Sequence, residues 1–132
     1  MTNHASGSFE VKMVPQGAGD QADGIAVGRM SLDKEYRGDL EGTGKGEMLA
    51  ARTSVAGSAG YVAIERVTGA LQGRRGSFVL QHHGIMTRGT PTLSVMVVPD
   101  SGTGELTGLS GNLTINIVDG KHLYEFDYTI TP

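Results

Sequence analysis

Residues 60–84, GYVAIERVTGALQGRRGSFVLQHHG, constrain the fold more than any other stretch of the chain. The stretch contains two runs in which apolar and polar side chains alternate, and this period of two is typical of half-buried β-strands. Gln72-Gly73 lies between the runs, where a dipeptide ending in glycine favours a tight hairpin turn. We therefore expect an antiparallel pair of strands, residues 60–71 and 75–87, at the centre of the fold.

The length of this turn decides which side chains of the two strands share a face. A loop of two or four residues places Glu65 and His82 on the same side. They are directly opposite with four residues, and diagonal neighbours with two, roughly 7–8 Å apart between Cα atoms. A loop of three residues places Glu65 with Gln81 and His83 instead. We favour a shared face for Glu65 and His82, because it also gathers the aromatic and aliphatic side chains of both strands into one apolar surface.

The same alternation continues through most of the remaining chain. Six further strands are expected, at residues 8–15, 25–36, 40–54, 92–98, 106–118 and 121–130. Residues 1–6 are small and polar, so we expect a frayed tail there. Residues 15–24 are rich in Gly, Asp and Gln, which is typical of a loop.

Eight strands with short connections and no helical stripe predict one all-β domain over residues 1–132. Short connections favour an up-and-down meander, and closure into a barrel removes the exposed strand edges. We therefore predict a closed eight-stranded antiparallel up-and-down barrel, with a two-sheet sandwich as the alternative. Such a barrel is either filled by side chains or holds one small ligand.

Glycine is unusually frequent, at 21 of 132 residues, where average usage is ~7%. Gly42, Gly44 and Gly46 fall on one face of a predicted strand and leave that face without side chains. Since glycine weakens a strand, such a row indicates a sharp bend, a close approach of another element, or room for another group. The spacing does not match a phosphate-binding loop, and no helix signal follows the row.

Composition excludes several classes of function. The net charge is −3 and the Lys and Arg residues are scattered, which argues against nucleic acid as a partner. Cysteine is absent, so disulfides and thiolate chemistry are excluded. No apolar run reaches the ~18 residues of a membrane span, and residues 1–13 do not resemble a signal peptide. We expect a cytoplasmic protein that does not bind membranes.

The best candidates for chemistry are Glu65 and His82, which can act as acid and base if both line an apolar barrel. The plainer alternatives are that the two residues close a polar network inside the barrel, or that Glu65 points to solvent. Adjacent residues of a strand point to opposite faces, so His82-His83 is not a metal motif, and we expect neither metal nor cofactor. Four inward aromatic residues are the candidate ligand contacts: Tyr61, Phe78, Tyr124 and Tyr128.

Three phrases carry a resemblance to a known family: residues 60–84, VVPDSGTGELTGLSGN at residues 97–112, and HLYEFDYTI at residues 122–130. The sequence resembles the bacterial family DUF3224 over nearly its whole length. That family is similar in fold to the allene oxide cyclase-like, or calycin-like, barrels, so the resemblance implies an eight-stranded barrel with an interior cavity. Allene oxide cyclases place a lone glutamate deep in the barrel, and Glu65 is the candidate for a similar position. The resemblance implies no established reaction.

Three functions follow from these observations. The first is a barrel that binds an apolar or amphipathic small molecule, with Glu65, His82 and Tyr61 at the ligand's polar end. The second is an isomerase or cyclase that uses Glu65 and His82 as acid and base in the same cavity. The third is a filled barrel that acts through its outer surface as a homo-oligomeric module. We place ligand binding ahead of catalysis.

Overall fold

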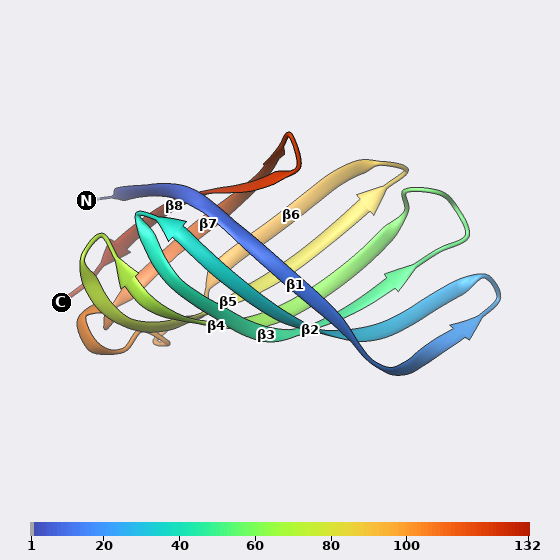
Figure 1. The fold of residues 1–132 in the computed structure, drawn as a ribbon, viewed down its shortest axis with the longest axis horizontal. Helices are drawn as coiled ribbons and strands as arrows, with labels where there is room; N and C mark the ends of the chain where they lie inside the picture. The colour runs from blue at the N-terminus through green and yellow to red at the C-terminus, as the bar shows by residue number, and fades with distance from the viewer. Residues whose placement is uncertain (1) are drawn as a thin grey trace.

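The structure, a computed structural model, describes residues 2–132 and consists of one closed antiparallel barrel (Figure 1). The strands follow one another around the barrel in chain order, and β1 closes it by pairing with β8. The elements are β1 (Asn3–Ala22), β2 (Ile25–Gly38), β3 (Leu40–Arg52), β4 (Ala59–Leu71), β5 (Arg74–Thr87), β6 (Thr90–Val97), the 3₁₀ turn η1 (Gly104–Leu106), β7 (Leu109–Val118) and β8 (Lys121–Ile130). The predicted eight-stranded up-and-down barrel is confirmed, and the sandwich is excluded. Among residues 2–132, no helix has the length and hydrophobicity needed to cross a bilayer.

Two-residue turns join the strands of four hairpins. In the central hairpin Leu71 pairs with Arg74, so the loop is only Gln72-Gly73, with φ of 47° and 86°. Positive φ at both positions is the type I′ geometry that matches the twist of the flanking strands. The same pattern occurs at Asp23-Gly24, Arg88-Gly89 and Asp119-Gly120. The four-residue loop is thus excluded, and β5 begins one residue earlier than predicted.

The first strand differs most from the prediction. Residues 1–6 were expected to be a frayed tail, but residues 3–6 lie in β1 and pair with β8; Met1 lies outside the described residues. Residues 15–24 were expected to be a loop, but β1 continues to Ala22. The pairing of β1 with β2 shifts register between Gln16 and Asp20, and the glycines of this segment lie at that irregularity.

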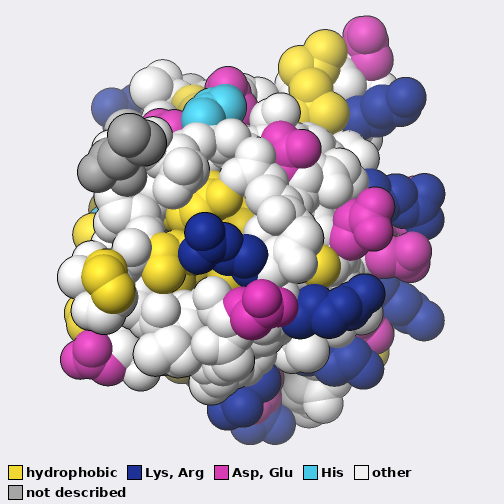
Figure 2. Space-filling view, turned by 90° about the vertical axis from the view of Figure 1, so that its left-hand side faces the viewer, with side chains coloured by type: hydrophobic (Ala, Val, Ile, Leu, Met, Phe, Trp, Pro, Cys, Tyr) yellow, Lys and Arg dark blue, Asp and Glu magenta, His cyan; other side chains and the backbone are white. Residues whose placement is uncertain are grey.

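Aromatic and aliphatic side chains fill the barrel at the end where both termini lie (Figure 1). The ring of Phe126 stacks between Phe78, at 5.9 Å between centroids, and Tyr128, at 5.2 Å. Leu106 of η1 is fully buried beside this stack. Figure 2 looks onto this end and shows hydrophobic side chains at its centre with a basic side chain lying across them. This half of the interior is therefore packed core.

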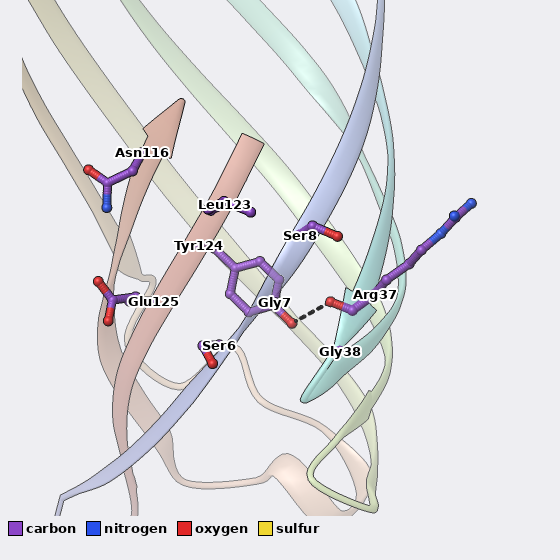
Figure 3. A pocket seen from close by; sticks show the side chains of 9 residues that line it. All are labelled: Ser6, Gly7, Ser8, Arg37, Gly38, Asn116, Leu123, Tyr124 and Glu125. Atoms are coloured by element: carbon purple, nitrogen blue, oxygen red, sulfur yellow. Dashed lines mark hydrogen bonds between the residues drawn. The ribbon is translucent and has the colours of Figure 1, made fainter. Parts of the chain in front are cut away.

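Tyr124 fastens the turn between β2 and β3 to the interior. Its hydroxyl accepts the backbone N–H of Leu40 at 2.9 Å and donates to the carbonyl oxygen of Arg37 at 3.0 Å (Figure 3). The ring reaches this position beneath Gly7, where a β-carbon would lie 2.5 Å from the hydroxyl oxygen. A β-carbon at Gly7 would also overlap the carbonyl oxygen of Arg37, so the glycine is required by the close approach of both the β2 backbone and Tyr124 to β1.

Replacing Tyr124 with phenylalanine is expected to lower the free energy of unfolding by about 1–3 kcal/mol, because the buried N–H of Leu40 loses its acceptor. Urea denaturation measures the change. Tyr61→Phe is the matched control, since no hydrogen-bond partner of the Tyr61 hydroxyl is found within residues 2–132, and its change should stay within about 0.5 kcal/mol. Equal losses in the two variants would contradict the role given to Tyr124.

The opposite end of the barrel is less filled. The long β1–β2 hairpin and the ends of β3, β4 and β5 extend beyond the β7–β8 hairpin (Figure 1). Towards this end, the inward positions of β2 and β3 change to methionine, alanine and glycine, and their side chains become half-buried. β6 and β7 are joined by one residue pair, Met96 with Asn112. We call this end the mouth; its inward residues include Met13, Met30, Met48, Ala50 and Tyr61.

Candidate functional site

Glu65 of β4 and His82 of β5 meet in the interior of the barrel. His82 Nε2 lies 2.8 Å from Glu65 Oε1, and the two side chains are 3% and 0% exposed. Glu65 pairs across the strands with Leu80, and Ala63 pairs with His82, so Glu65 and His82 are diagonal neighbours. The two-residue turn at Gln72-Gly73 produces this offset. The shared inward face predicted for Glu65 and His82 is confirmed.

Two residues of β2 complete a buried network around the carboxylate. Lys34 Nζ donates to Glu65 Oε1 at 3.0 Å, and the Tyr36 hydroxyl donates to Glu65 Oε2 at 2.6 Å. Lys34 also lies over the ring of Phe9, with Nζ 4.6 Å from the centroid. Within residues 2–132, no buried side-chain nitrogen or oxygen is left without a hydrogen-bond partner. The carboxylate of Glu65 is therefore held by three donors from two strands.

The glycine row of β3 makes this network possible. Glu65 lies on β4 and Lys34 on β2, so their side chains meet across the inner face of β3. A β-carbon at Gly44 would overlap the Oε2 atom of Glu65, and one at Gly46 would overlap the carbonyl oxygen of Ile64. Gly44 thus makes room for the carboxylate, while Gly46 allows β3 and β4 to approach closely. Two of the three explanations considered for the glycine row therefore apply: Gly44 leaves room for another group, and Gly46 allows the close approach of another strand.

The surroundings of Glu65 determine its charge. Burial by itself raises the pKa of Glu65, but the hydrogen bond from His82, the charge of Lys34 and the hydrogen bond from Tyr36 together lower the pKa below its usual value. The pKa of Tyr36 is raised well above its usual value, mainly by burial and further by the charge of Glu65 and the hydrogen bond to it. Glu65 is therefore a carboxylate near neutral pH, and Tyr36 stays protonated and donates.

This charge state predicts how stability depends on pH. Because the pKa of Glu65 is lower in the folded protein, its ionisation stabilises the fold above about pH 4.5, and this contribution is lost as the pH falls through the folded value. We expect Glu65→Gln to be less stable than the wild type at about pH 7, with a smaller difference at about pH 3. Urea denaturation at both pH values tests this. A difference that grows in acid would show that the sign is wrong.

The four aromatic residues expected to contact a ligand lie at different places. The Tyr61 ring is half-buried at the mouth and lies over Gly84. The pKa of the Tyr61 hydroxyl is raised, mainly by burial and to a smaller extent by the charge of Glu65. Phe78 and Tyr128 belong to the aromatic stack at the filled end, where the Tyr128 hydroxyl donates to the Gln72 side chain. Tyr124 holds the β2–β3 turn. A ligand contact at these four residues stays a prediction, and Tyr61 is the one beside the mouth.

Lys34 and Tyr36 are the site residues that sequence analysis did not single out. Both lie on the inward face of the predicted second strand, where alternation alone places a lysine among apolar side chains. An inward lysine two positions from an inward tyrosine is the signal that was available, because a buried ammonium requires a partner. The partner itself was not evident, since it lies two strands away.

Two hollows are found on the outside of the barrel. One, of about 440 Å³, lies where β8, β1 and the end of β2 meet, and Ser6, Ser8, Arg37 and Glu125 are among its lining residues (Figure 3). The second, of about 490 Å³, lies on β2 to β5 and is lined mainly by apolar side chains. Within the described residues, no group of three or more histidines and acidic residues could hold a metal ion.

Comparison with known proteins gives a family and similar solved structures. The family described as "Protein of unknown function (DUF3224)" matches residues 5–128. A crystal structure of a DUF3224 protein of unknown function from Shewanella oneidensis MR-1 is 52% identical, covers 100% of both chains and has a TM-score of 0.94. No curated protein matches the sequence. The similarity to allene oxide cyclase-like barrels stays a prediction. Because the family match covers almost the whole sequence, this chain belongs to the DUF3224 family.

Proposed function

We propose that this barrel binds an amphipathic small molecule at its mouth, with the ligand's polar end at Lys34. The observation that carries the proposal is the buried network of Lys34, Glu65 and His82. Buried ion pairs contribute little net stability compared with apolar residues of the same size, so their presence is weak evidence for a purely structural role. Perturbed, buried titratable groups are more frequent at functional sites.

Lys34 is the member of the network best able to contact a ligand. An ammonium group has three N–H donors, and the structure gives Lys34 one acceptor, Glu65 Oε1, among the described residues. Lys34 is 6% exposed, whereas Glu65 is completely enclosed. A ligand oxygen at Lys34 would therefore use donors that the protein leaves free, without disturbing the carboxylate.

The charges of the network favour a neutral polar group over an acid. Lys34 and the ionised Glu65 already neutralise each other, so a bound carboxylate would add an unbalanced negative charge in a poorly solvated place. A hydroxyl or carbonyl oxygen can accept from Lys34 without that cost. The walls suit an apolar chain, because Met13, Met30 and Met48 are flexible side chains that adapt to irregular ligands.

Catalysis by Glu65 and His82 ranks second. A general base works best when its pKa lies near the working pH, but the pKa of Glu65 is lowered by its three donors. Each of these donors stabilises the ionised carboxylate and so makes Glu65 a weaker base. The same contacts suit an anchor that holds Lys34 and His82 in fixed positions.

Titration with decanol, followed through the methionine methyl signals by NMR, tests the proposal. We expect saturable shifts of the Met30 and Met48 signals in the wild type, and binding about tenfold weaker in Lys34→Met, which lacks the donor. Lys12→Met is the matched control, because Lys12 lies on the outward face of β1 and should leave binding unchanged.

Decane supplies a comparison that does not depend on the stability of a variant. It has the same chain without the hydroxyl, so the wild type should bind decane more weakly than decanol. Equal binding of decane and decanol would exclude a polar anchor, and no shift of the methionine signals with either molecule would exclude binding at the mouth.

A further inference from the structure

The outer wall of the barrel carries a mainly apolar face over β2 to β6, interrupted on β5 by the outward side chains of Gln81 and His83. Residues that pair across neighbouring strands place its side chains next to one another: Leu49 pairs with Val62, and Ile64 lies two positions along the same face of β4. The six large side chains are 43–60% exposed: Val27, Leu49, Val62, Ile64, Ile85 and Met96. We call these six residues the wall patch.

The wall patch contains a hollow beside its protruding side chains. Gly60 lies between Ala51 and Ile85 in one cross-strand row, and a β-carbon at Gly60 would meet only the carbonyl oxygen of Gly84, at 3.7 Å. The hollow at this place has a volume of about 490 Å³. Protruding side chains and a hollow therefore lie side by side on one face. A two-fold symmetric contact needs a self-complementary surface, and a protrusion beside a hollow can provide one, because each copy then supplies both parts.

The extent and charge of the wall patch favour a second copy of the chain. Six half-exposed apolar side chains amount to on the order of 500 Å², near the upper limit for the largest patch of a monomer. With the surrounding rim, the face approaches the ~800 Å² that each partner buries in a standard interface. At the edge, Arg29 pairs with Glu47 at 3.3 Å. These opposite charges balance each other, so two identical faces would meet without strong repulsion.

We infer that the wall patch is the interface of a homodimer, in which protruding side chains of one copy enter the Gly60 hollow of the other. The surface is on the outside of the barrel, so this inference does not depend on what the interior binds. It assigns the homo-oligomeric contact to β2–β6 rather than to the filled end or the mouth.

Sedimentation velocity over a range of micromolar concentrations tests the inference with two variants. Val62→Glu places a charge in the contact and should weaken dimerisation at least about a hundredfold. Gly60→Gln fills the hollow and should also abolish the dimer. Because the space around Gly60 is open in the single chain, this variant should keep the fold of the wild type. A circular dichroism spectrum like that of the wild type checks that the variant is folded.

Val118→Glu is the matched control, since Val118 is a 49% exposed valine on β7, outside the wall patch, and the variant should remain dimeric. Two results would overturn the inference. One is a wild-type protein that sediments as a monomer throughout, which would leave the patch to an unrelated protein or a lipid surface. The other is a Gly60→Gln variant that stays folded and dimeric.

Discussion

Replacing Glu65 with methionine is expected to lower the free energy of unfolding by about 3–5 kcal/mol, the usual cost of removing one partner of a buried ion pair. The variant leaves the Lys34 ammonium buried without its carboxylate, and removes the acceptor of both Tyr36 and His82. The loss is large because buried donors without partners keep their full desolvation cost. Urea denaturation at neutral pH measures it.

The double variant Lys34→Met/Glu65→Met separates the charge effect from packing. Removing both charges eliminates the unpaired ammonium, so the double variant should be more stable than Glu65→Met alone. A double-mutant cycle then gives the coupling between Lys34 and Glu65, which we expect to exceed about 1 kcal/mol. Additive losses in the two single variants would contradict a direct interaction between the buried charges.

Replacing Gly46 with alanine is expected to cost about 2–3 kcal/mol, the upper part of the range for overpacked interiors. The new β-carbon would overlap the carbonyl oxygen of Ile64 on β4. Because this atom belongs to the backbone of a paired strand, relief requires β3 and β4 to move apart. Each lost kcal/mol corresponds to a decrease of roughly 3–5 °C in the midpoint of thermal unfolding for a domain of this size.

Gly28→Ala is the matched control for Gly46→Ala. Gly28 occupies an inward position of β2, but a β-carbon there would meet nothing within 4 Å. Alanine reduces the freedom of the unfolded chain, so Gly28→Ala should be neutral or stabilising by up to about 1 kcal/mol. If the two variants lost equal stability, the close approach of β3 and β4 would not be the reason for the glycine at position 46.

Local sequence signals were sufficient for the parts of the fold that depend on neighbouring residues. The Gln72-Gly73 turn and the alternation on either side placed Glu65 and His82 on one face, because a hairpin turn of even length fixes which side chains point inward. The paired residues 3–6 could not be found in this way. They are small and polar, and they become a strand only because β8, more than a hundred residues away, provides backbone partners.

Only part of the site, Glu65 and His82, was predicted from the sequence, and the reason that Lys34 and Tyr36 were not is geometric. Lys34 and Tyr36 reach Glu65 from β2 across the inner face of β3, where Gly44 has no side chain. A contact between second neighbours in a barrel depends on strand tilt and stagger, which alternation does not determine. The glycine row had indicated a close approach or free space. Only the register of β2, β3 and β4 shows that Lys34 and Glu65 are the residues that meet there.

A crystal structure of the protein grown with decanol tests the central claim most directly, because it locates the ligand's oxygen relative to Lys34. We predict that the chain of decanol lies among the methionines of the mouth and that its hydroxyl oxygen lies within about 3 Å of Lys34 Nζ, with the bond between Lys34 and Glu65 preserved. Decanol bound only on the outer wall, with Lys34 unchanged and out of contact with it, would contradict the account.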